Sequence, residues 1–396
     1  MRPEKTTMTA GAAGLCALLL AGCSGPAPQE GGPESEETPH GYVEGAEETA
    51  EPQSRLVLAD TASGEVRLLD LLTEEVTELG RAEGADGITG DGRFAYLHSS
   101  GDGTTEVFDS GVWTVDHGDH DHYYRTGPGH VGALDGATAS DVVTDTALTS
   151  VTGTGGASLV LDRAELEEGT VTAADPLPED AATALPYAGR LLLIDASDGA
   201  VGAVDRDGER NETLDETCTA PRGAAVTRRG LVVGCEEGTL HVTEEDGSLD
   251  AGILPHPGTG RTESFQHRPG SAVLASLSTE GDLWVLDLAA AEWRELDHTG
   301  AVAVTAVGEG APVLALDGDG TLHSLDPGTG QERAATPLLD SVDPDRPPAL
   351  QADTSRAYVN DAGAGLVHEI DYNDDLRAAR TFEVGIAPHL MVETGR

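Results

Sequence analysis

Short apolar runs, rather than long amphipathic stretches, dominate this chain. From residue 55 onward, runs of about three to six residues rich in Val and Leu alternate with turns rich in Gly, Asp and Ser. Runs of this length between turn residues are typical of β-strands, whereas a helix requires a longer stretch with a 3.6-residue period. The pattern therefore predicts an all-β domain over residues 55–396.

A turn motif recurs between these runs and reveals a larger period. An apolar run ends in Asp, Gly follows within five residues, and the next run begins, as at 58–66, 193–201, 314–322 and 359–367. Units of about forty residues, the period of a four-stranded propeller blade, follow from this repeat. Their predicted starts lie near Arg55, Asp86, Ala139, Ala184, Gly223, Glu263, Ala301 and Ala349. This count predicts a β-propeller of eight blades, with seven blades, a β-sandwich or two smaller β-domains as the alternatives.

The two ends of the domain complement each other. The first unit, residues 55–80, offers only three candidate strands, and residues 387–394 form one strand without a blade of its own. Pairing these segments would remove the open edges of an unclosed array. We therefore expect both termini to close one blade.

The N-terminus has the features of an export signal. Arg2 and Lys5 precede an apolar stretch over residues 10–20, which is too short to span a bilayer comfortably. The following Leu-Ala-Gly-Cys at 20–23 resembles a bacterial lipobox, which implies cleavage before Cys23 and lipidation of its sulfur. Two acyl chains suffice for stable anchoring. Residues 1–22 are thus predicted to be a lipoprotein signal peptide, and the protein to be held extracytoplasmically on the outer face of the cell membrane.

Residues 23–54 form a predicted acidic tether. Ser, Gly, Pro and Glu dominate and branched apolar residues are scarce, so the segment cannot bury enough surface to offset its ordering entropy. His40, however, lies among Glu44, Glu47 and Glu48. This arm is therefore either a plain spacer or a segment that collects a metal or folds over a site.

Charge and cysteine content indicate which partners and which covalent links the sequence allows. The formal net charge of −48 argues against nucleic acid as a partner. Apart from Cys16 in the signal segment and the predicted lipidation site Cys23, the chain has two cysteines, Cys218 and Cys235. An even pair in an exported protein predicts a disulfide across a hairpin. A thiolate metal site is the alternative, which requires a reducing compartment or further ligands nearby.

Histidines and aspartates are concentrated at residues 116–122, Asp-His-Gly-Asp-His-Asp-His. Imidazole and carboxylate are the donors that Zn²⁺ prefers beside thiolate, and the spacing suits a loop or strand. His117, Asp119, His120 and His122 are therefore predicted to bind Zn²⁺, with a solvated polar loop as the alternative. In the propeller scheme His267 ends an inner strand at the same face and is a further candidate ligand. His389 lies towards the opposite mouth, and the remaining histidines are scattered singly.

Three segments resemble a known family. These are Asp-Ser-Gly-Val-Trp at 109–113 leading into the His-Gly-Asp-His run, the cysteine hairpin followed by residues 236–240, and Val-His-Glu-Ile-Asp at 367–371. They are similar to the periplasmic zinc metallochaperones called AztD. The resemblance implies a β-propeller that binds Zn²⁺ and hands it to the solute-binding protein of a zinc ABC transporter. It assigns this role to His117, Asp119 and His120, with His122 and His267 as further ligands.

The chain also departs from that family. Gram-negative members carry a His-rich N-terminal stretch and Leu-His-Gly-Glu after the first hairpin cysteine. In this chain the tether has only His40, and Pro-Arg-Gly-Ala occupies residues 221–224. A second, low-affinity zinc site therefore lacks its motifs.

Two other functional classes remain open. A metal-dependent propeller hydrolase or lactonase needs an open coordination position and a general base, which the His-Asp run can supply, although the sequence has no separate nucleophile motif. A non-catalytic propeller that binds proteins or is stabilised by Ca²⁺ is the third class, but Ca²⁺ prefers oxygen ligands and does not explain the histidines. The sequence thus favours a zinc carrier that is not an enzyme.

Overall fold

A computed structural model describes residues 45–118, 120–153, 156–174, 181–206 and 210–396. The predicted lipidation site Cys23, His40 and the predicted ligand Asp119 lie outside these residues. Within them, α1 (Arg163–Glu167) is the only α-helix, and the remaining elements are strands. The all-β prediction is confirmed.

Eight antiparallel sheets follow one another along the described chain. In order of strand pairing, the first sheet consists of β33 (Leu390–Thr394), β2 (Arg55–Ala59), β3 (Glu65–Asp70) and β4 (Val76–Arg81), and the second of β5 (Gly87–Gly90), β6 (Phe94–Ser99), β7 (Thr104–Asp109) and β10 (Gly129–Asp135). The third sheet consists of β11 (Ala139–Thr144), β12 (Leu148–Gly153) and β13 (Ser158–Asp162). The fourth consists of β14 (Ala181–Tyr187), β15 (Arg190–Asp195), β16 (Ala200–Val204) and β17 (Arg210–Thr217).

The fifth sheet consists of β18 (Arg222–Thr227), β19 (Gly230–Gly234), β20 (Thr239–Glu245) and β21 (Ser248–Leu254), and the sixth of β22 (Val273–Leu277), β23 (Leu283–Asp287) and β24 (Glu292–Leu296). The seventh consists of β25 (Ala301–Ala306), β26 (Val313–Asp317), β27 (Thr321–Leu325) and β28 (Glu332–Pro337). The eighth consists of β29 (Leu350–Ala352), β30 (Ala357–Asp361), β31 (Leu366–Asp371) and β32 (Arg377–Glu383). A ninth, smaller sheet has the order β1 (Glu47–Thr49), β9 (Asp121–Arg125), β8 (Val112–Asp116).

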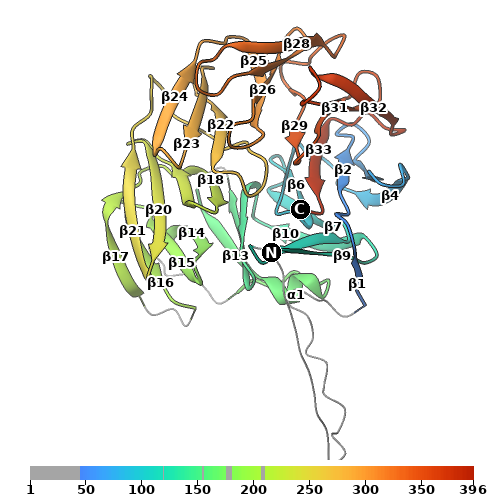
Figure 1. Ribbon diagram of the computed structural model, residues 1–396. Helices are drawn as coiled ribbons and strands as arrows, with labels where there is room; N and C mark the ends of the chain where they lie inside the picture. The colour runs from blue at the N-terminus through green and yellow to red at the C-terminus, as the bar shows by residue number, and fades with distance from the viewer. Residues whose placement is uncertain (1–44, 119, 154–155, 175–180, 207–209) are drawn as a thin grey trace, which may run out of the picture. The chain divides into compact units, whose positions relative to one another are not determined.

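The eight larger sheets form the blades of a propeller (Figure 1). A central cavity of about 660 Å³ is lined by residues of the innermost strands β5, β11, β18, β25, β29 and β33. The predicted unit starts coincide with the first strands of these sheets to within a few residues, except that β22 begins ten residues after Glu263. The blade count from the forty-residue period is therefore confirmed.

Closure of the ring is also confirmed. The C-terminal strand β33 pairs antiparallel with β2, with Arg55 opposite Thr394 and Ala59 opposite Leu390 (Figure 1). Leu56, Val57 and Leu58 are all fully buried, because both faces of the blade pack against neighbouring blades. Double-sided burial explains why the second strands read as continuous apolar runs rather than as an alternating pattern.

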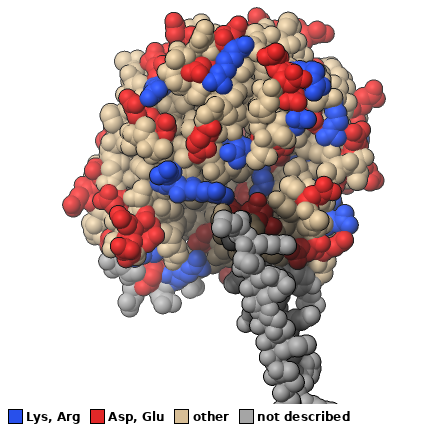
Figure 2. Space-filling view, in the orientation of Figure 1, with Lys and Arg blue, Asp and Glu red and all other residues tan. Residues whose placement is uncertain are grey.

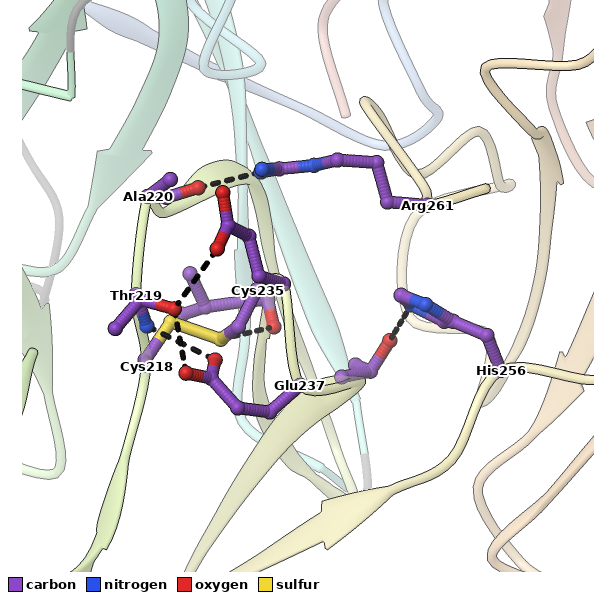
Figure 3. Close-up of a disulfide and its surroundings, with 10 residues drawn as sticks. Cys218, Thr219, Ala220, Cys235, Glu237, His256 and Arg261 are labelled. Atoms are coloured by element: carbon purple, nitrogen blue, oxygen red, sulfur yellow. Dashed lines mark hydrogen bonds between the residues drawn. A yellow bond between two sulfur atoms is a disulfide. The ribbon is translucent and has the colours of Figure 1, made fainter. Parts of the chain in front are cut away.

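The predicted disulfide is present between Cys218 and Cys235, 17 residues apart (Figure 3). It joins the end of β17 to the end of β19, and closing such a loop contributes about 3 kcal/mol in the chain-entropy model. The carboxylate of Glu237 accepts hydrogen bonds from the backbone N–H and the hydroxyl of Thr219, at 3.0 and 2.5 Å. Arg261 donates to the carbonyl of Ala220. These polar contacts lie on the solvent-exposed side of the disulfide.

The folded domain begins before residue 55, the boundary that composition predicted. Residues 47–49 form β1, which pairs with β9, and Glu47 makes an ion pair of 2.8 Å with Arg125. Composition indicates only how many apolar side chains a segment can bury, whereas backbone pairing along an edge strand needs none. The last part of the predicted tether is therefore an edge strand of the ninth sheet. No helix of sufficient length and apolarity to cross a membrane occurs in the described part of the chain.

Candidate metal site

The hairpin β8–β9 carries the predicted histidines. It is inserted between the third and fourth strands of the second blade, as the sequence predicted, and Asp116 faces Asp121 at its end. The backbone N–H of His117 donates to the carbonyl of His120 at 3.0 Å, and Gly118 adopts a positive φ of 86°. The glycine permits this tight tip at little steric cost. The short loop places His117 beside His120.

Three imidazoles converge at this tip. The ring centroid of His117 lies 5.1 Å from those of His120 and His122, and the latter two are 4.9 Å apart. The Nε2 atoms of His120 and His122 are separated by 3.1 Å. Two donors on one tetrahedral Zn²⁺ lie roughly 3.3 Å apart, given Zn–N bonds of about 2.0–2.1 Å. The imidazoles therefore already have a spacing that suits one ion.

Glu48 on β1 fixes the orientation of one imidazole. Its Oε1 lies 2.6 Å from Nδ1 of His122, which leaves Nε2 of that ring directed towards His120. A carboxylate on the second nitrogen of a metal-bound histidine sets the tautomer and raises the basicity of the ring. The strand within the predicted tether thus supplies a supporting carboxylate, as one of the two interpretations of that segment allowed.

The base of the hairpin is tightly packed. On the strand face that carries His122, Tyr124 is fully buried and stacks on Trp113 at 5.5 Å between centroids. The guanidinium of Arg93 lies 3.9 Å from the Trp113 ring centroid and pairs with Asp109 at 2.7 Å. Exposed imidazoles therefore project from a packed aromatic base.

Polar contacts fix the hairpin to two other parts of the propeller. Arg228, in the β18–β19 turn, lies 2.5 Å from Asp116, and the hydroxyl of Thr114 donates to the carbonyl of Gly395 at 2.9 Å. The hydrogen bond from Arg228, with that from the Gly118 N–H, holds the pKa of Asp116 below its usual value. Connections after first and third strands leave a blade at the same end. The hairpin, the Arg228 turn and the C-terminus therefore lie at one mouth of the propeller.

His267 lines the central cavity below this mouth. Its backbone forms a parallel bridge with Ala306 in the neighbouring blade. Burial, with the positive charges of Arg396 and Arg268, lowers the pKa of His267 to about 4. The ring is thus neutral, which suits a ligand, but the cations beside it repel a divalent ion. The structure brings together His117, His120 and His122, whereas a ligand role for His267 stays a prediction.

A second cluster was missed by sequence reasoning, which treated its histidines as scattered. His298, Asp317 and His323 place ligand atoms within 4.8 Å of one another, so that the group could hold a metal ion. The signal was present in the repeat itself, since Asp317 ends the run before a turn glycine and His323 follows that glycine by three residues. His298 comes from the connection to the preceding blade, and only the fold reveals its proximity.

The molecule as a whole is acidic. Figure 2 shows Asp and Glu side chains scattered over much of the face it presents, with fewer Lys and Arg side chains among them, in keeping with 71 acidic against 23 basic residues. Such a surface raises the local concentration of cations and opposes binding of polyanions.

Comparisons with known proteins bear on the fold. No protein-family model matches the sequence, and no curated protein does so either. Among solved structures, AztD from Citrobacter koseri matches with a TM-score of 0.70 at 18% identity, covering 87% of this chain and 98% of that one. Apo AztD from the same organism matches at 0.69, with the same identity and coverage. The dihydro-heme d1 dehydrogenase NirN matches at 0.56 and 14% identity, over 88% and 76% of the two chains. The chain therefore has an AztD-like β-propeller fold.

Proposed function

We propose that the protein is an extracytoplasmic zinc metallochaperone that delivers Zn²⁺ to the solute-binding protein of a zinc ABC transporter. The observation that carries the proposal is the convergence of His117, His120 and His122 at an exposed hairpin tip, with Glu48 supporting one ring. Asp119 is the proposed fourth ligand. The AztD-like fold supports the same role.

The geometry suits a cargo site rather than a permanent structural one. The proposed ligands lie within six residues on one hairpin, and His117 and His120 are exposed. An approaching acceptor can thus replace them one at a time without unfolding the propeller. Protons also compete with Zn²⁺ for the imidazole nitrogens, so the affinity falls as the solution becomes acidic.

The proposed location follows from two features. The Cys218–Cys235 disulfide is typical of an oxidising compartment. A lipid on Cys23 would keep the protein on the outer face of the membrane. Tethering would raise its effective concentration beside a membrane-bound transporter.

Transfer kinetics test the proposal. Zn²⁺-bound protein is mixed in a stopped-flow instrument with the apo solute-binding protein of the zinc transporter from the same organism, at increasing acceptor concentration. We expect the transfer rate to rise with acceptor concentration and to exceed the rate of release to a chelator, because the acceptor takes the ion through a complex. A transfer rate equal to free dissociation at every concentration would contradict direct delivery.

The same preparation separates this role from catalysis. We propose that the protein is not an enzyme, so the Zn²⁺ form should not hydrolyse lactone or ester substrates above the rate with the variant His117→Ala/His120→Ala. Turnover lost in that variant would instead support a metal-dependent hydrolase at the same hairpin.

A further inference from the structure

The group His298, Asp317 and His323 has the chemistry and spacing of a metal site. Nε2 of His298 lies 2.8 Å from Oδ1 of Asp317, and Nε2 of His323 lies 3.2 Å from Oδ2 of the same carboxylate. The two imidazole centroids are 4.9 Å apart. All three side chains are mostly buried, with exposed fractions of 13–18%. A single ion could therefore take one donor atom from each residue without a large rearrangement.

A fourth residue supports this group. Oε2 of Glu332 lies 2.8 Å from Nδ1 of His323, so the carboxylate holds the ring with Nε2 facing Asp317. Glu332 belongs to β28 and His323 to the adjacent β27. Metal-bound histidines commonly have such a partner on the second ring nitrogen. The arrangement repeats the Glu48–His122 pair of the hairpin in an unrelated part of the propeller.

The group lies at the opposite mouth from the hairpin. Asp317 ends the second strand of its blade, and His298 lies in the connection from the preceding blade. Both connections leave at the end opposite to that of the β8–β9 insertion, because strand direction alternates. An ion here would be independent of one held by His117, His120 and His122.

Comparison of the blades shows that this combination is unusual within the molecule. The last blade has Asp361 and His368 at positions equivalent in strand register to Asp317 and His323, 3.6 Å apart. The connection that enters this blade ends in Pro347 and Pro348, and among the described residues it supplies no third donor to the pair.

The first blade has the other incomplete set. His389 precedes its innermost strand and lies 3.3 Å from Asp60, while Arg67 occupies the strand position of the second histidine. The repeated fold thus places one histidine beside one aspartate in the first and last blades. Among the described residues, only the blade β25–β28 adds a third donor to such a pair.

We propose that His298, Asp317 and His323 form a second divalent-metal site, with Glu332 as the supporting carboxylate. Two imidazoles and one carboxylate favour Zn²⁺ and similar borderline ions over Ca²⁺ or Mg²⁺, which prefer all-oxygen ligands. Three protein ligands leave one tetrahedral position for water. The ion would link the connection between β24 and β25, which carries His298, to the turn between β26 and β27. This inference does not depend on the proposed delivery of zinc.

Metal counting in a variant without the hairpin site tests the proposal. In His117→Ala/His120→Ala, equilibrium dialysis against Zn²⁺ should still give one bound equivalent, and Co²⁺ should give the visible absorption of a tetrahedral site. Adding His298→Gln and His323→Gln should abolish both signals, since the glutamine side chains retain hydrogen bonding but lose the imidazole donors. Glu332→Gln alone should weaken binding about 10- to 100-fold.

His368→Gln is the matched control, because this residue has the same strand position and faces one aspartate without a third donor. It should leave the metal count and the Co²⁺ spectrum unchanged. Circular dichroism confirms that each variant is folded. Retention of the equivalent after loss of His298 and His323, or absence of any equivalent in folded His117→Ala/His120→Ala, would overturn the second site. Neither result would alter the test of delivery from the hairpin.

Discussion

At the scale of single residues, a carboxylate decides which nitrogen one histidine of each cluster presents. Glu48 and Glu332 each lie within hydrogen-bonding distance of one Nδ1, 2.6 Å from His122 and 2.8 Å from His323. A neutral ring that donates from Nδ1 has its lone pair on Nε2, the atom available to an ion. In both clusters Nε2 faces the other proposed ligands, so the tautomer is set before any metal arrives.

The variant Glu48→Gln tests this effect at the hairpin. We expect the Zn²⁺ affinity to fall about 10- to 100-fold, because a neutral amide orients His122 but no longer raises the basicity of its ring. Competition with a chromophoric chelator at fixed pH measures the change. Glu47→Gln on the same strand is the control, since Glu47 pairs with Arg125 instead. Equal affinities for the two variants would show that Glu48 plays no part in binding.

Ligands that lie close together along the chain could be predicted from the sequence, whereas those that meet only in the folded molecule could not. Three histidines within six positions predicted the hairpin cluster. His298 and His323 are far apart in the sequence. They meet because the connection from the preceding blade, which carries His298, lies beside β27, which carries His323. In the sequence Glu48 is one of several carboxylates near His40. Its pairing with His122 requires β1 to lie beside β9, which no periodicity in an acidic segment indicates.

At the scale of elements, the closing strand β33 contains an unfavourably placed charge. Glu393 is fully buried, and its Oε1 has no hydrogen-bond partner among the described residues. Burial raises the pKa of Glu393 from 4.5 to about 7, although Arg396 lies 3.2 Å from its other oxygen and opposes the shift. The folded protein therefore holds this proton more tightly than the unfolded chain does. Its carboxylate costs stability as pH rises from about 4.5 to 7, and the full cost persists above 7.

Replacement by Gln should remove this dependence. A shift from 4.5 to about 7 corresponds to about 3 kcal/mol at most. We expect Glu393→Gln to raise the free energy of unfolding by about 1–3 kcal/mol at pH 8 and to change it little at pH 4.5. Urea unfolding at both pH values measures the difference, with the exposed Glu383→Gln as the control. A gain of the same size at both pH values would rule out titration of Glu393 as its cause.

At the scale of the whole molecule, repetition made the fold predictable. A period of about forty residues predicted the blades, their number and the closure, because each blade must bury both faces against its neighbours. The ninth sheet was not predicted as such. Its strands β1, β8 and β9 pack outside the repeat, where neither the period nor a continuous apolar run marks them. The hairpin β8–β9 with its three histidines belongs to this sheet, so the proposed site of zinc delivery lies in the least periodic part of the sequence.

Ring closure should be essential to the stability of the domain. Deletion of residues 388–396 removes β33 and exposes the backbone edge of β2, whose Leu56, Val57 and Leu58 are fully buried. Met391 and Val392 alone account for about 3–6 kcal/mol of apolar burial, a large part of the 5–15 kcal/mol typical of a whole domain. We expect the truncated protein to lose cooperative thermal unfolding or to aggregate through the open edge.

A peptide spanning residues 386–396, added in trans, should restore the cooperative transition by pairing with β2, as a donated strand completes an open sheet. Differential scanning calorimetry with and without the peptide measures the rescue, and a peptide of the same composition in scrambled order is the control. The restored transition should shift upward with peptide concentration, because the peptide binds only the folded ring. A truncated protein that unfolds at the full-length midpoint without peptide would show that the ring does not depend on its C-terminal strand.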